Sequence, residues 1–233
     1  MPLRFIATII VLTCLLAIVV TAVIHRNAGQ KAPASAEKNS LRSIAERAKN
    51  EGKQSVRVPS PRIDYAGENI GLDEALQNYS VVVAQPIDSK SYLSDSELIV
   101  NWYRFQILES LSQRPPYSCN TCPAAPDLPG DLPRPGQDEF YTVAVGGTVT
   151  IDGVQVTMNN PALPQFEKGR KYLLFVSLAP SGVAVIGGGP SGVFRVGDDE
   201  ILKPANKDNR RLKTDIQARF DSRLRTFKGR VKP

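Results

Sequence analysis

Two of the three cysteines in the chain form a C-x-x-C motif, Cys119 and Cys122, inside the stretch "SCNTCP". This spacing can serve dithiol exchange, supply half of a zinc site or close a small disulfide loop. An exchange centre places its first cysteine at a helix N-terminus, which stabilises the thiolate. Here Pro115, Pro116 and Pro123 flank the pair, and proline is unfavourable inside a helix. The motif therefore favours a disulfide that clips a loop.

The other ligand-type residues are remote from this motif. The chain has one histidine, His25, and its third cysteine is Cys14, both close to the N-terminus. The body of the chain therefore lacks the base of a Ser-His-Asp or Cys-His nucleophile, and the thiols of one chain cannot complete a four-ligand zinc site. We predict a disulfide between Cys119 and Cys122, and no catalytic, metal or cofactor site. Thiol–disulfide exchange by this pair is the alternative, followed by a metal shared between two copies.

A glycine-rich stretch at residues 187–192, "GGGPSG", matches the letters of the G-x-G-x-x-G dinucleotide fingerprint. That fingerprint needs a helix after the glycines, because the helix N-terminus holds the pyrophosphate. The residues that follow, "VFRV", alternate like a strand instead. We predict a hairpin loop here and no nucleotide site.

The first apolar run, residues 5–24, contains 20 residues without a charge. At 1.5 Å per residue a helix of this length spans roughly 30 Å, the thickness of a bilayer core. A cleaved signal peptide has a shorter apolar region that leads directly to a small-x-small site, which this run lacks. We expect a retained single-pass anchor. The basic residues after the run favour a cytoplasmic location for the rest of the chain. A short N-terminal tail before a long apolar run is instead typical of exported proteins, and a C-x-x-C loop suits an oxidising compartment. We expect the body on the periplasmic or extracellular side.

Positive charge is concentrated in the C-terminal tail. The chain has a net charge of +6, but residues 203–233 carry 11 Lys and Arg against 3 Asp, so the tail is +8 and the other 202 residues sum to −2. The tail has an apolar stripe with four-residue spacing: Leu212, Ile216, Phe220 and Leu224. We predict a basic amphipathic helix whose stripe docks on the body, leaving the basic face for anionic lipid. The aromatic residues belong to the stripe, so no nucleic-acid partner is expected.

The remaining elements are read from periodicity. Residues 41–48 have the apolar spacing of a short helix that ends at Gly52, and residues 56–71 are expected to be a linker. A short helical turn at residues 72–76 precedes "SVVVAQP", a strand expected to stop at Pro86.

Alternating or apolar runs continue to about residue 202. "NWYRFQILES" and "EFYTVAV" read as strands, and Asp152-Gly153 in "VTIDGVQVT" is a two-residue hairpin turn. "KYLLFVSL" is apolar on both faces and is expected to be a central strand, and "VAVIG" and "GVFRV" are expected to form a last hairpin. Many short strands with regular turns predict a mainly β fold, an antiparallel barrel or sandwich.

The order "VVVAQP", "YRFQILES", "VAVGGTV", "PQFEKGRKYLLFV" and "GGGPSGVFRV" over residues 72–202 resembles a domain of uncharacterised bacterial exported or membrane-anchored proteins. The resemblance implies an antiparallel OB-like β-barrel of the netrin type. Some netrin-type modules inhibit metalloproteases through an N-terminal cysteine. This chain has the apolar run in that place, so the resemblance does not bring that role with it.

Together these patterns predict four parts: a transmembrane anchor at 1–26, a juxtamembrane helix and linker at 27–70, a β-barrel domain at 71–203 and a basic helix at 204–233. The anchor would place the protein in the bilayer of the cell envelope. The function predicted is a non-enzymatic binding or accessory module with an envelope protein as partner. The alternatives are thiol–disulfide exchange by Cys119 and Cys122, or binding of an anionic membrane or a nucleic acid through the basic tail. Recognition would fall mainly to the loops that are long enough to contact a partner, at residues 112–137 and 187–192.

Overall fold

The computed structural model describes residues 40–61, 70–112, 126–163, 165–205 and 211–231. The expected span at residues 5–24 and the cysteines Cys119 and Cys122 lie outside these ranges. Within them, no helix combines the length and the apolar character needed to cross a membrane.

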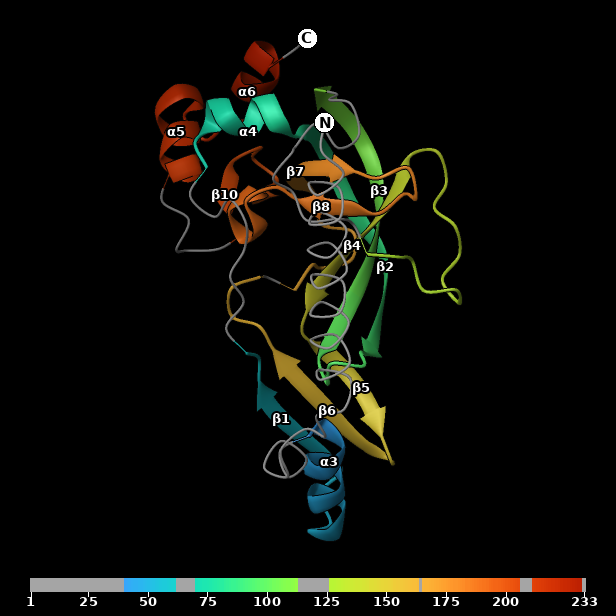
Figure 1. The fold of residues 1–233 in the computed structure, drawn as a ribbon. Coiled ribbons are helices and arrows are strands. Elements are labelled where there is room, and N and C mark those ends of the chain that lie inside the picture. The colour runs from blue at the N-terminus through green and yellow to red at the C-terminus, as the bar shows by residue number, and fades with distance from the viewer. Residues whose placement is uncertain (1–39, 62–69, 113–125, 164, 206–210, 232–233) are drawn as a thin grey trace, which may run out of the picture.

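The described chain is mainly β and elongated, with a small sheet at one end, a large sheet in the middle and helices at the other end (Figure 1). The large sheet has the order β10-β9-β7-β2-β3-β4, with β8 also paired to β7. Its strands are β2 (Ser80–Leu93), β3 (Ile99–Ser112), β4 (Glu139–Val145), β7 (Tyr172–Leu178), β8 (Ala184–Ile186), β9 (Val193–Val196) and β10 (Leu202–Pro204).

All ladders of the large sheet are antiparallel, as expected. The central position predicted for "KYLLFVSL" is confirmed, because β7 pairs with β2 on one edge and with β8 and β9 on the other. The strands expected to form a barrel do not close into one among the described residues. Strand β8 is three residues long and forms no ladder with β4. The two strands are joined only by the parallel bridge between Tyr141 and Val183, which precedes β8.

Strand β2 continues past Pro86 to Leu93, so the predicted stop at this proline is wrong. Strand β7 pairs with β2 only as far as Ala84, and the Pro86 carbonyl accepts a hydrogen bond from Gly169 N at 3.0 Å beyond that point. The missing proline N–H therefore falls on an edge that has no strand partner. The ladder to β3 shifts its register between Pro86 and Asp88 and then continues.

The small sheet has the order β1-β6-β5 and is formed by β1 (Ser55–Pro59), β5 (Gly147–Ile151) and β6 (Val154–Asn159). The predicted turn joins β5 to β6, with Asp152 at φ 50° and Gly153 at φ 86°, so the hairpin is confirmed. Strand β1 lies within the expected linker and pairs in parallel with β6. The five-residue pattern "SVRVP" is too short to predict a strand by itself, and the strand becomes evident only from its pairing with β6.

The predicted helix before this sheet is confirmed as α3 (Leu41–Asn50). Its N-terminus is capped by Ser40, whose hydroxyl accepts a hydrogen bond from Ser43 N at 3.1 Å. The chain leaves the helix through Gly52, at φ 72°. Its apolar face packs on the small sheet in one core cluster, so α3 and β1 belong to the folded body.

The C-terminal tail forms two helices instead of one, α5 (Arg211–Phe220) and α6 (Leu224–Val231). Asp221 and Ser222, both with positive φ, break the helix between them. This turn is held by β10 and its neighbour: Leu202 N donates to Ser222 O at 2.7 Å and Leu224 N donates to Glu200 O at 2.9 Å. The apolar stripe of the tail is buried in one core cluster with α4 (Leu72–Asn78), β2, β7 and β9.

Candidate functional site

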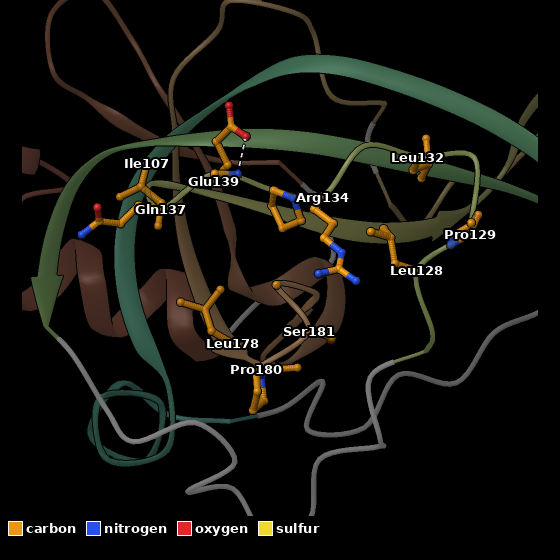
Figure 2. Close-up of a pocket in the computed structure, with 15 residues that line it drawn as sticks. Ile107, Leu128, Pro129, Leu132, Arg134, Gln137, Glu139, Leu178, Pro180 and Ser181 are labelled. Atoms are coloured by element: carbon orange, nitrogen blue, oxygen red, sulfur yellow. Dashed lines mark hydrogen bonds between the residues drawn. The ribbon is translucent and has the colours of Figure 1, made fainter.

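A groove of about 750 Å³ lies between the proline-rich loop at 126–138 and the turn at 178–182. Figure 2 shows these two segments as its opposite walls. Strand β3 contributes Ile107 and strand β4 begins at its edge with Glu139. The groove therefore sits where the loop that the sequence singled out returns to the large sheet.

The loop is held on the sheet by Asp131. Its carboxylate accepts a hydrogen bond from Lys90 Nζ at 2.7 Å and another from Tyr92 OH at 2.8 Å, both on β2. The Lys90 contact, with the Tyr92 contact second, lowers the pKa of Asp131 below its usual value. Leu128 and Leu132, on either side of Asp131, pack against an apolar cluster that includes Trp102 of β3 and Tyr141 of β4. The loop is thus anchored by both polar and apolar contacts.

Glu139, at the base of the loop, is engaged through one of its two carboxylate oxygens. Its Oε2 accepts hydrogen bonds from Arg104 Nη2 at 2.6 Å, Arg104 Nε at 3.0 Å and Gly136 N at 2.8 Å. The Gly136 N–H and then the Arg104 guanidinium lower the pKa of Glu139 below its usual value. A carboxylate held ionised in this way is a poor proton donor near neutral pH. We assign it a structural role, joining the loop to the sheet.

The two walls of the groove meet at Pro135 and Gly182. Gly182 adopts φ 78°, and a Cβ on it would stand 2.2 Å from Pro135 Cγ. The turn is closed by Gly182 N donating to Ala179 O at 2.9 Å, and Gly182 O accepts from Tyr141 N on β4 at 2.9 Å. Only glycine fits here, because the conformation and the contact both exclude a side chain.

Two side chains of the groove have unused hydrogen-bonding groups. Arg134 and Ser181 are both exposed, and neither has a hydrogen bond or ion pair with the rest of the described chain. Figure 2 shows the Arg134 guanidinium directed into the groove, between Leu128 and the turn that carries Ser181. Arg134 lies in the loop that the sequence analysis selected, but Ser181 was missed. Its only local signal was the Pro180-Ser181-Gly182 turn sequence.

The second loop chosen from the sequence, residues 187–192, is buried, so its expected role in recognition is wrong. It connects β8 to β9, which pair with β7 and not with each other, so the expected last hairpin is also wrong. A Cβ on Gly187 would stand 2.5 Å from the Tyr79 ring, and one on Gly192 would stand 2.1 Å from Gly187 O. Glycine is required at Gly187 because the Tyr79 ring, which is distant in sequence, packs directly on it. Glycine is required at Gly192 because the Gly187 carbonyl approaches it closely.

The basic face of the tail is partly neutralised. Arg219 pairs with Asp73 of α4 at 2.6 Å, and Lys228 pairs with Glu109 of β3. Exposed cations without an ion pair to the described residues include Lys213 of α5 and Arg225 of α6. They lie on the helical end of the molecule, away from the groove of Figure 2.

Within the described ranges, no three or more His, Cys, Asp or Glu side chains gather where they could hold a metal ion. The predicted disulfide residues, Cys119 and Cys122, precede the described part of the loop and are not placed. The groove between Arg134 and Ser181 is therefore the best supported site in the described structure. No protein-family model matches the chain, and no curated protein matches it either.

Proposed function

We propose that this protein is a non-enzymatic binding module of the cell envelope, and that the groove between residues 126–138 and 178–182 receives a segment of an envelope protein. The observation that carries the proposal is the character of the groove. Its walls combine apolar side chains with the unused donors of Arg134 and Ser181, and such a mixture suits recognition of a ligand.

The non-enzymatic assignment rests on the titratable groups of the groove. The one carboxylate among its lining residues is Glu139, which is engaged by Arg104 and Gly136. General acid–base or nucleophilic catalysis needs a group with an accessible proton or lone pair beside an activating partner. Arg134 and Ser181 do not make such a pair, since an arginine stays protonated.

We further propose that residues 5–24 anchor the protein as a single membrane span and that the body lies on the exported side. The length and uncharged character of that run support the anchor. A chain anchored in this way would present its groove to other proteins of the envelope.

We propose that the large sheet is a partly open OB-like barrel in which the neighbouring strands, in order around the barrel, are β2, β3, β4, β8 and β7. Three observations support it: β2-β3-β4 form a meander, β7 pairs with both β2 and β8, and the one bridge between β4 and the start of β8 is parallel. In such a barrel the groove would lie beside the junction of β4 and β8, where a single bridge stands in place of a ladder.

The test is site-specific photocrosslinking in cells that express the full chain. A photoreactive residue at Gln137, an exposed lining position of the groove, should give a discrete adduct with an envelope protein. The control is the same residue at Gln155, which is exposed on β6 in the small sheet. The adduct at 137 should disappear when Ser181→Trp fills the groove. Equal adducts at both positions, or an adduct that survives Ser181→Trp, would contradict the proposal.

A further inference from the structure

We infer that the groove recognises a carboxylate within an apolar peptide segment, and that Arg134 and Ser181 bind it from opposite walls. The inference rests on the proposed binding function and adds the chemistry of the ligand. It would make the partner sequence one with an Asp, a Glu or a C-terminal carboxylate beside apolar residues.

The first support is an uncompensated positive charge. Arg134 has no carboxylate partner in the described chain. Glu139, the one carboxylate among the lining residues, pairs instead with Arg104 and with Gly136 N through its Oε2. The guanidinium points into the groove in Figure 2, so a ligand would meet it without any rearrangement of the loop. An arginine offers paired N–H groups in a fork that fits a carboxylate.

The second support is a donor on the facing wall. The turn hydrogen bond runs from Gly182 N to Ala179 O, and it leaves the Ser181 N–H and hydroxyl unused within the described structure. An ionised carboxylate only accepts hydrogen bonds and has two oxygens to satisfy. One oxygen can therefore bind Arg134 while the other binds Ser181.

The third support is the apolar lining, which includes Ile107, Leu128, Leu132 and Leu178. Phosphorylated ligands are usually bound by clusters of arginine, and this groove has a single cation among its lining residues. A peptide carries its carboxylate among apolar side chains and matches both properties. We therefore assign the ligand to a peptide rather than to a phosphate.

The fourth support is that both walls already have contacts with the large sheet. The loop is fixed by Asp131 to Lys90 and Tyr92, and the turn is fixed to β4 through Gly182. Pro135 and Gly182 hold the walls in contact with each other. A ligand would not need to order either segment, so little binding free energy would be lost to conformational entropy.

The experiment uses the full chain in detergent and two pools of short fluorescent peptides, measured by fluorescence anisotropy. Both pools have randomised Leu, Pro, Ala and Ser positions around one fixed residue, which is Glu in one pool and Gln in the other. We expect the Glu pool to bind about tenfold tighter or more, as a charge-assisted hydrogen bond predicts. Arg134→Gln should abolish this preference, and Arg134→Lys should restore part of it.

The matched control is Arg57→Gln, which removes an exposed arginine from β1 in the small sheet and should leave the preference unchanged. Equal binding of both pools by the unaltered chain, or a preference that persists in Arg134→Gln, would overturn the inference. Binding of neither pool would also overturn it. The photocrosslink at Gln137 tests the binding function separately, so that function survives if the adduct forms while the peptide preference fails. Displacement of the Glu pool by inorganic phosphate at an equal concentration would overturn the peptide assignment.

Discussion

Pro135 lies directly over Gly182, so that a Cβ on the glycine would approach the proline Cγ to 2.2 Å. This contact joins the loop at 126–138 to the turn that follows β7, across an interval of more than 40 residues in the sequence. The shape of the groove depends on this close contact between the loop and the turn. Substitution at Gly182 therefore tests the architecture of the site.

Gly182→Ala is expected to lower the melting temperature and to weaken binding in the groove. The methyl group would meet the Pro135 ring and would also disfavour the backbone at φ 78°. A loss of about 2–3 kcal/mol corresponds to roughly 4–12 °C for a chain of this size. Calorimetry would measure it.

The matched control for this substitution is Gly153→Ala. Gly153 has a similar φ, 86°, but open space around the position of a Cβ. The difference between the two variants isolates the contact with Pro135. Equal losses in both would show that Pro135 does not restrict the turn.

The ion pair between Glu139 and Arg104 should make stability depend on acidic pH. The pKa of Glu139 is lowered in the folded state, by the Gly136 N–H and then by Arg104. The stabilisation is therefore complete above the unfolded pKa and is lost as pH falls through the lower, folded value. Urea unfolding between about pH 6 and pH 3 should show a smaller decline for Glu139→Gln than for the unaltered chain. Glu46→Gln, an exposed change on α3, should leave the decline unaltered.

The buried stripe of the tail should contribute strongly to stability. Ile216→Asp with Phe220→Asp places two charges in the cluster that contains Val81 and Phe175, at a cost of about 5 kcal/mol or more. The melting temperature should fall by about 10–20 °C or the body should fail to fold. The control pair Lys213→Asp and Arg225→Asp adds two carboxylates at exposed positions of the same helices. A similar melting temperature for both pairs would mean that the tail does not dock in solution.

The disulfide between Cys119 and Cys122 remains a prediction. In intact cells, a membrane-impermeant maleimide should label the pair only after reduction, if the body is exported and the bond is formed. Labelling without a reductant would exclude the bond, and labelling only after lysis would place the body in the cytoplasm. A Cys14→Ala background removes the third thiol from the measurement.

Some features of this fold are determined by the local sequence. The Asp152-Gly153 turn lies between two alternating runs. The β5–β6 hairpin forms there because its two-residue turn needs positive φ at both positions, and Asp and Gly adopt it readily. The run at Tyr172–Leu178 is apolar on both faces, and it lies in the middle of the large sheet. The turn depends on two adjacent residues, and the central strand is marked by its own composition, because a strand covered on both faces must be apolar on both.

Other features were decided by the tertiary structure. Pro86 ends no strand because β7 has already left that edge, and residues 187–192 are buried because Tyr79 packs on Gly187. Arg134 and Ser181 line the same groove because their sequence neighbours Pro135 and Gly182 lie in contact. A glycine or proline in the sequence marks an unusual backbone or a close approach, but not which distant residue approaches it. That partner is chosen only when the strands pair, because the free energy of burial depends on contacts between segments far apart in the chain.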